Sequence, residues 1–233
     1  MPSFINRSYQ LELLDNLNVP FSDIKRNMQE LDTINTLLGG HSITIKGVRK
    51  LLQHHHSKNI SICEIGCGGG DNMRAIDKWF HKRDLHASYI GIDINPNCIE
   101  HARASAGLDQ AHWIVNDYKA VRFTDKPTII FSSLFCHHFK NEELASMFRW
   151  MHENSALGFF VNDLHRHWFA YHSIKWLTAA FSRSYMVKND APLSVLRGFS
   201  RKELMDLMQQ AGIKNYSIEW KWAFRWLLTC RRD

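Results

Sequence analysis

The chain has 233 residues, of which 45% are hydrophobic and 22% charged, and its net charge is +6. These values are typical of one globular domain with a full hydrophobic core, and no apolar run reaches the roughly 18 residues that a membrane span requires. Five cysteines without framework spacing predict reduced thiols and a cytoplasmic location, and the N-terminus lacks the pattern of a secretory signal.

The first 57 residues predict a helical N-terminal cap in front of a main domain that spans residues 58–233. Apolar residues recur at helical spacing between residues 23 and 38, and Gly39-Gly40 is expected to end this helix. A second, shorter helix is expected over residues 45–53.

From residue 59 onward, strand patterns alternate with helix patterns, which predicts a parallel sheet with helices on both faces. Strands are expected over 59–64, 87–92, 111–115, 127–132 and 156–162, and helices over 71–82, 96–106, 141–153 and 200–211. Two further strand-like runs, 216–221 and 224–230, predict an antiparallel pair at the sheet edge. The fold class is therefore α/β, a doubly wound, seven-stranded and mostly parallel sheet.

The segment 60–71 reads as a strand that ends on the acid Glu64, followed by a turn and a helix start. The turn holds four glycines: Gly66, Gly68, Gly69 and Gly70. Glycines allow positive φ and close approach of a ligand, and the free N–H groups of the helix point to the same place. Asp71 stands where a dinucleotide fingerprint would need glycine, and no Gly-Lys-Ser/Thr follows. Nicotinamide, flavin and P-loop nucleotide sites are therefore disfavoured.

A second strand also ends on an acid. Asp93 follows the run 86–92 and precedes Ile94 and a helix that begins near Pro96. A carboxylate at this place can accept hydrogen bonds from both hydroxyls of a ribose.

The two acid-tipped strands resemble the class I S-adenosylmethionine (SAM)-dependent methyltransferases over roughly residues 58–233. Four residues match the family's E/D-x-G-x-G-x-G turn: Glu64, Gly66, Gly68 and Gly70. The resemblance implies a Rossmann-like methyltransferase fold, SAM as the methyl donor and S-adenosylhomocysteine (SAH) as the product.

The resemblance also implies positions for the parts of SAM. The backbone of Gly66, Cys67 and Gly68 would contact the methionine part, whose amino group would lie near Glu64. Asp93 would bind the ribose, and Ile94 would lie against the adenine. After the third strand, Asp117 and Tyr118 match the family's adenine contacts, although Asp117 also suits a helix N-cap.

The fourth strand leads into the run 131–139, where relatives line the sulfonium and the acceptor, and Ser133 is counted among the SAM contacts. His137 or His138 could act as the general base, with His138 preferred, or one of them could only hold the loop. At the end of the fifth strand, Asp163 resembles a position that touches the acceptor. His137, His138 and Asp163 could bind magnesium, but a cluster of carboxylates is lacking, so no metal is expected.

An aromatic-rich insertion follows the fifth strand at residues 165–199. Residues 165–185 predict a helix that is apolar on more than one side, and residues 189–192 predict a loop. In small-molecule relatives such an insertion covers the substrate; a homodimer interface or plain core are alternatives. The cap of residues 1–57 would be a lid, with Arg26 or Arg49 at the methionine carboxylate, or would only pack on the core.

We therefore expect methyl transfer to a small, aromatic or polyketide-like acceptor, with O-methylation favoured. An RNA methyltransferase or RNA-binding module is an alternative suggested by the net charge, but the basic residues are scattered and no Asn-Pro-Pro-Tyr motif follows the fourth strand. A third interpretation is a protein that binds SAM without methylating.

Overall fold

The computed structural model describes residues 2–16, 18–53, 55, 59–105, 107–108 and 110–232. Within these residues one sheet of seven strands runs in the order β3-β2-β1-β4-β5-β7-β6. The strands are β1 Ile60–Ile65, β2 Ala87–Asp93, β3 His112–Val115, β4 Ile129–Ser133, β5 Gly158–Leu164, β6 Tyr216–Lys221 and β7 Arg225–Arg231. Strands β1 to β5 are parallel, whereas β7 pairs antiparallel with both β5 and β6. The expected doubly wound fold and its antiparallel edge pair are confirmed.

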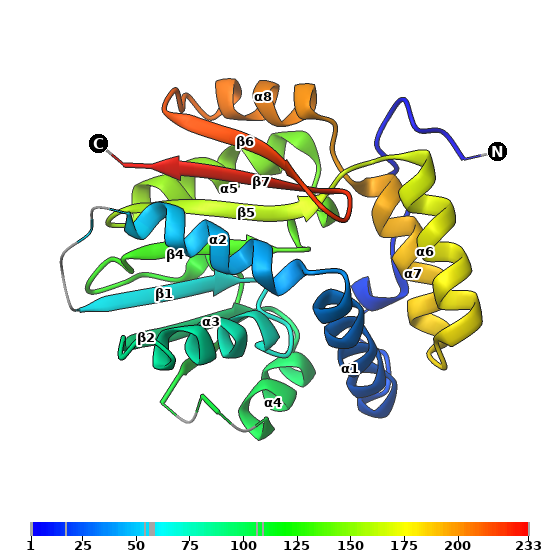
Figure 1. Ribbon diagram of the computed structural model, residues 1–233, viewed down its shortest axis with the longest axis horizontal. Coiled ribbons are helices and arrows are strands. Elements are labelled where there is room, and N and C mark those ends of the chain that lie inside the picture. Colours follow the sequence, from blue (N-terminus) through cyan, green and yellow to red (C-terminus); the bar gives the residue numbers. More distant parts are fainter. Residues whose placement is uncertain are drawn as a thin grey trace.

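Helices lie on both faces of this sheet and at one of its ends (Figure 1). They are α1 Phe21–Leu37, α2 Gly40–Leu52, α3 Asp71–His81, α4 Pro96–Ala104, α5 Asn141–Asn154, α6 Trp168–Phe181, α7 Tyr185–Arg197 and α8 Arg201–Gln210. Short 3-10 helices are η1 Leu13–Asp15, η2 Tyr118–Ala120 and η3 Cys136–His138. None of the helices in the described part of the chain combines the length and apolarity needed to cross a bilayer.

The two N-terminal helices have different positions. Gly39 takes a φ of 75° after α1 and caps the start of α2, which therefore begins earlier than the sequence pattern predicts. Helix α2 contacts β5 and β7, and a Cβ on its Gly47 would lie 2.6 Å from the ring of Phe160. Helix α2 is thus part of the layer on the sheet, while α1 lies at the end of the sheet (Figure 1). The division at Ser57 and Lys58 lies outside the described residues.

The insertion after β5 forms two helices, α6 and α7. The predicted loop at residues 189–192 is wrong, because these residues lie within α7 and Pro192 stands inside the helix. Tertiary packing outweighs the local preference: Val187 and Leu193 are buried, and the Asp190 carboxylate accepts hydrogen bonds from the N-terminal segment.

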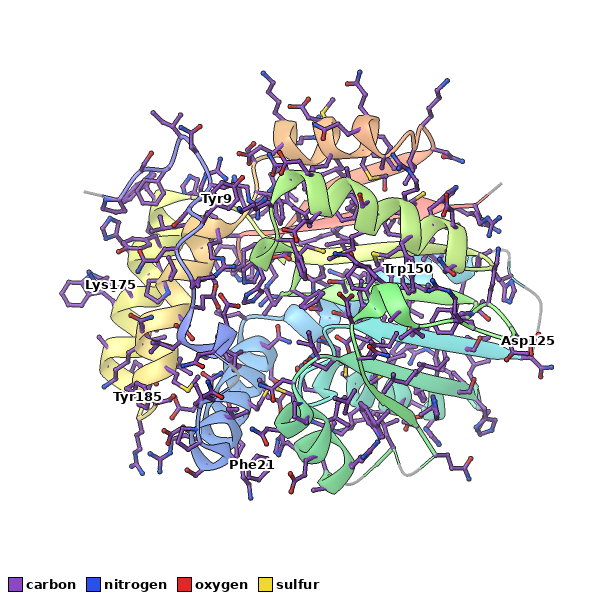
Figure 2. All side chains as sticks on the ribbon, turned by 180° about the vertical axis from the view of Figure 1, so that it is seen from behind. Tyr9, Phe21, Asp125, Trp150, Lys175 and Tyr185 are labelled. Carbon is purple, nitrogen blue, oxygen red and sulfur yellow. The ribbon has the colours of Figure 1, made fainter. Side chains whose placement is uncertain are left out.

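The core consists of an apolar cluster on each face of the sheet. Phe159 belongs to the cluster beneath α5 and α8, and Phe160 belongs to the cluster beneath α2 and α3. This follows from the alternation of side chains along a strand. Figure 2 shows the face that carries Trp150 of α5. The five cysteines are buried and form no disulfide with one another.

Candidate active site

A cavity of about 410 Å³ lies at the carboxyl ends of the strands. Its wall comes from η1, α1 and the loops that follow β1, β2 and β4. Among the residues predicted from the sequence, those that line it are Glu64, Gly66, Cys67, Gly68, Asp93, Ile94, Ser133 and His138. Gly70, Asp117, Tyr118, His137 and Asp163 do not line it. Parallel sheets of this kind bind ligands at this edge.

The glycine turn after β1 lets other groups approach its backbone closely. Gly66 and Gly70 take φ values of 65° and 75°, and a Cβ on Gly66 would lie 2.1 Å from the ring of Phe135. The N–H groups of Gly66 and Cys67 both donate to the carbonyl of Ile92, at 2.8 and 3.1 Å. Backbone contacts from these two residues to a ligand would therefore use their carbonyl oxygens or Cα atoms, not their N–H groups.

Glu64 presents an unsatisfied acceptor to the cavity. The side chain is buried, and its Oε1 accepts a hydrogen bond from Nδ2 of Asn72 at 3.0 Å. Its Oε2 has no hydrogen-bond partner among the described residues. Burial raises the pKa of Glu64, and the neighbouring Asp71 raises it further. A cationic group placed in the cavity would satisfy this oxygen and favour the charged carboxylate.

Asp93 joins the ends of β1 and β2. Its Oδ2 accepts from the N–H of Gly68 at 2.9 Å, and its Oδ1 accepts from the N–H of Asn95 at 2.9 Å. Burial raises the pKa of Asp93, while these backbone N–H groups oppose the shift. Each carboxylate oxygen keeps a lone pair for a hydroxyl donor. Ile94 beside it is an exposed part of the cavity wall.

Asp117 and Tyr118 lie apart from the cavity. The Oδ1 of Asp117 accepts from the N–H of Lys119 at 2.9 Å and caps η2, which is the alternative interpretation given above. Tyr118 is buried, and its ring lies 5.1 Å from that of Trp150. Their part in adenine binding stays a prediction.

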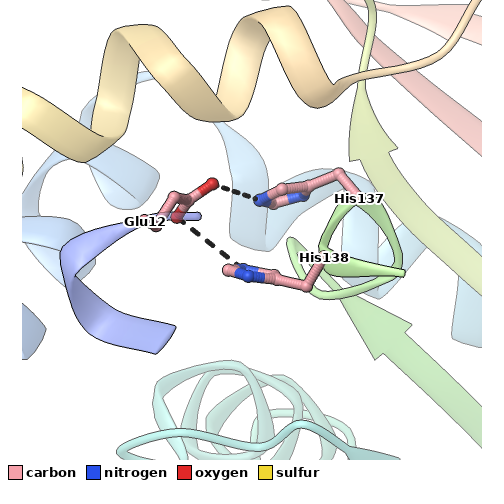
Figure 3. A group of neighbouring side chains, drawn as sticks. All are labelled: Glu12, His137 and His138. Atoms are coloured by element: carbon pink, nitrogen blue, oxygen red, sulfur yellow. Dashed lines mark ion pairs between the residues drawn. The ribbon is translucent and has the colours of Figure 1, made fainter. Parts of the chain in front are cut away.

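Two adjacent histidines on η3 meet the N-terminal segment (Figure 3). The Nδ1 of His137 lies 2.7 Å from Oδ1 of Asp163, and its Nε2 lies 3.5 Å from Oε1 of Glu12. Burial by itself would lower the pKa of His137, but the carboxylates of Asp163 and Glu12 raise it to about 9. His137 therefore carries a proton at neutral pH, which argues against a role as general base.

His138, unlike His137, lines the cavity. Its Nδ1 lies 2.7 Å from Oδ1 of Asp15, and its Nε2 lies 3.8 Å from Oε2 of Glu12. Although burial opposes it, His138 and Arg197 together hold the pKa of Asp15 below its usual range. A charged Asp15 orients the imidazole by accepting from Nδ1–H, which leaves Nε2 as the basic nitrogen.

Residues 62–158 match the model of the methyltransferase domain family. This match spans the glycine turn, both acid-tipped strands and the histidine pair. The chain carries a class I SAM-dependent methyltransferase domain.

Solved structures agree with this family in fold. The methyltransferase is similar to magnesium protoporphyrin IX methyltransferase from Synechocystis PCC 6803 with bound SAM, at 13% identity and a TM-score of 0.61, over 97% of this chain and 100% of that one. It is also similar to the plantazolicin methyltransferase BpumL in complex with SAH, at 18% identity and a TM-score of 0.60, over 85% and 72% of the two chains. At these identities the likeness shows the fold alone. No curated protein sequence matches the chain.

The polar groups that line the cavity of the methyltransferase match the polar groups of SAM. The free oxygen of Glu64 suits the amino group of the methionine part, and Asp93 suits the ribose hydroxyls. The turn at Gly66 has no room for a side chain, because Phe135 fills the space that a Cβ would take.

Sequence reasoning missed the residues that α1 and η1 contribute to the cavity: Leu11, Leu14, Asp15, Met28, Leu31, Asp32 and Asn35. Helical periodicity predicted α1 but gave no signal for which of its residues would face a ligand. His41 of α2 supports this wall, with Nε2 2.9 Å from Oδ1 of Asp32 and Nδ1 3.1 Å from Oδ1 of Asn72. Arg26 and Arg49 do not line the cavity, and Arg49 lines a separate hollow of about 1110 Å³ instead.

Among the residues that the structure describes, two clusters have donor atoms close enough to share a metal ion. One is Glu12, His137 and His138, and the other is Asp32, His41 and Asp71. In the first cluster Nη1 of Arg197 lies 3.7 Å from Oε1 of Glu12, and His137 holds a proton. A metal ion would have to displace this proton and compete with the guanidinium. The positive charges of Arg197 and His137 already neutralise the Glu12 carboxylate, so we assign no metal to this cluster.

Proposed function

We propose that this methyltransferase transfers the methyl group of SAM to a hydroxyl of a small, flat, apolar acceptor. The observation that carries the proposal is the composition of the cavity wall, where apolar side chains accompany one histidine. These side chains are Leu11, Leu14, Met28, Phe135 and Phe139, and the histidine is His138. Apolar walls with one convergent polar group are typical of small-molecule sites.

His138 has the geometry of a general base for a hydroxyl. Asp15 accepts from Nδ1–H, so Nε2 is the nitrogen that can take the proton as the acceptor oxygen forms its bond to the methyl carbon. The carboxylate of Glu12, 3.8 Å from Nε2, stabilises the imidazolium that results. SAM supplies an electrophilic methyl group on a sulfonium and leaves as the neutral thioether SAH.

The charge around the cavity disfavours a polyanionic acceptor. Glu64, Asp71, Asp93, Asp32 and Asp15 all line it. These carboxylates would repel the phosphates of RNA, whereas an apolar phenol or polyketide-like hydroxyl carries no such charge.

The test is His138→Gln with labelled SAM and a panel of phenols, amines, carboxylates and a structured RNA. We expect label in phenolic hydroxyls, and the variant should lose about a hundredfold or more in kcat, because a general base contributes that much. Its affinity for SAH, measured by calorimetry, should stay within about twofold.

His86→Gln, an exposed histidine before β2, is the matched control and should keep full activity. Label only in amines or in RNA would overturn the acceptor class. Full turnover in His138→Gln would overturn the role of the base alone.

A further inference from the structure

Helix α6 presents aromatic side chains where a water-facing helix would carry charged ones. Trp168, Phe169 and Trp176 are 57%, 47% and 76% exposed. At 100° per residue these three lie on one side of the helix, opposite the buried Ala170 and Thr178. Lys175 is the sole charged residue in the α6 sequence. None of these aromatic residues lines the SAM cavity, so substrate contact there does not explain them.

The turn between β6 and β7 extends this surface. The ring of Phe224 lies 5.8 Å from that of Phe169 and 6.0 Å from that of Trp222, which is 67% exposed. We call Trp168, Phe169, Trp176 and Trp222 together the aromatic face. Ring contacts thus join Trp168 and Phe169 of α6 to the turn with Phe224 and Trp222, two elements that are distant in sequence. A contiguous exposed patch of this kind marks an interaction site.

The exposed charged side chains of the segment that contains α6 have one sign. In residues 165–199 the exposed charged side chains are Lys175, Arg183 and Lys188. The acid of this segment, Asp190, is buried and accepts from backbone N–H groups of η1. Two carboxylates of α1 reach this segment, and both are occupied. Glu30 accepts from the N–H groups of Arg183 and Ser184 and from the hydroxyl of Ser182, and Asp23 accepts from the hydroxyl of Tyr185. Lys175 lies on the outer side of the helix pair, away from the sheet (Figure 2).

We propose that the aromatic face docks the methyltransferase onto the surface of an anionic lipid bilayer. Trp and Phe are suited to the headgroup region, and basic side chains beside them attract anionic lipids. Charge complementarity selects this partner over an apolar protein surface, because the exposed charged side chains of residues 165–199 are all basic. Helix α6 has 14 residues, so it lies on the bilayer and does not cross it.

The experiment is co-sedimentation of the full chain with vesicles of phosphatidylcholine alone and of phosphatidylcholine with 30% phosphatidylserine. We expect binding to the anionic vesicles, and a loss of binding in high salt. Trp168→Ser with Trp176→Ser should lower the partition coefficient by about tenfold or more. Lys175→Gln with Lys188→Gln should lower it by about fivefold for each charge removed.

Leu85→Ser is the matched control, because it removes an exposed apolar side chain before β2. It should bind vesicles as the native chain does. SAH binding by calorimetry verifies that each variant is folded. Absence of binding to anionic vesicles, or undiminished binding in the Trp168/Trp176 variant, would overturn the proposal. So would light scattering that shows a dimer which this variant dissociates, because the aromatic face would then contact a second copy.

Discussion

At the scale of single residues, the SAM site holds groups whose protonation a ligand would change. Glu64 is buried with one carboxylate oxygen unsatisfied, and burial raises its pKa. Such a group destabilises the empty protein and gains a partner only when a cation enters the cavity. The Glu64 carboxylate is therefore expected to lower the stability of the ligand-free protein and to raise its affinity for a cationic ligand.

Glu64→Gln tests this opposition. Without ligand, the free energy of unfolding in urea should rise by about 1 kcal/mol at pH 8, because a neutral amide costs less to bury than a carboxylate. A carboxyl with a raised pKa carries its penalty above the pKa of the unfolded chain, so the gain should fade toward pH 4. Affinity for SAH should fall by about tenfold. The exposed Glu100→Gln should change neither quantity, and an unchanged SAH affinity in Glu64→Gln would contradict the assigned contact.

At the scale of elements, the N-terminal segment is fixed across the mouth of the cavity by buried charged side chains. Arg7 donates to the carbonyls of Arg197, His137 and Phe139, at 2.9 to 3.1 Å. Asp190 of α7 accepts from the N–H groups of Leu13 and Leu14, at 2.8 and 3.1 Å. Hydrogen bonds from α7 thus hold η1 in place, which explains how residues of η1 reach the cavity wall.

Asp190→Ala should loosen η1 without disturbing the SAM site. Two hydrogen bonds to a charged group are lost, so residues 11–16 should exchange their amide hydrogens faster. The KM for the acceptor should rise by about tenfold, because Leu14 and Asp15 line the cavity and Asp15 orients His138. Affinity for SAH should stay within about twofold. Asp206→Ala, an exposed aspartate on α8, is the control. Equal exchange rates in both variants would contradict the role of Asp190.

At the scale of the whole molecule, the His137 network connects the start, middle and later parts of the chain. His137 lies between Asp163 of β5 and Glu12 of the N-terminal segment, and its backbone carbonyl accepts from Arg197 of α7. Loss of these contacts would release β5, the N-terminal segment and α7 from one another. The protonation of His137 should therefore affect global unfolding.

The pKa of His137 is raised from 6.5 to about 9, so its stabilising effect is complete below about pH 6.5 and is lost as the pH rises through about 9. The free energy of unfolding in urea should fall by up to about 3 kcal/mol between pH 7 and pH 10. His137→Gln should remove most of this slope. Burial raises the pKa of Cys63, Cys67, Cys98 and Cys136, so these thiols titrate in this range only in the unfolded chain. The comparison with the variant subtracts their effect because they are present in both. A slope that persists in His137→Gln would refute the assignment.

The sequence by itself determined the order of strands and helices, the glycine turn and the acids Glu64 and Asp93 at the strand ends. These features depend on local periodicity and on backbone conformations that only glycine adopts freely. The tertiary structure alone decided that Asp15 meets His138, 123 positions away, and that the aromatic residues of α6 face outward. It also overrode the loop signal around Pro192, because burial of α7 outweighs local preference. Contacts between distant segments follow from how elements pack, and a single sequence carries no local signal for that packing.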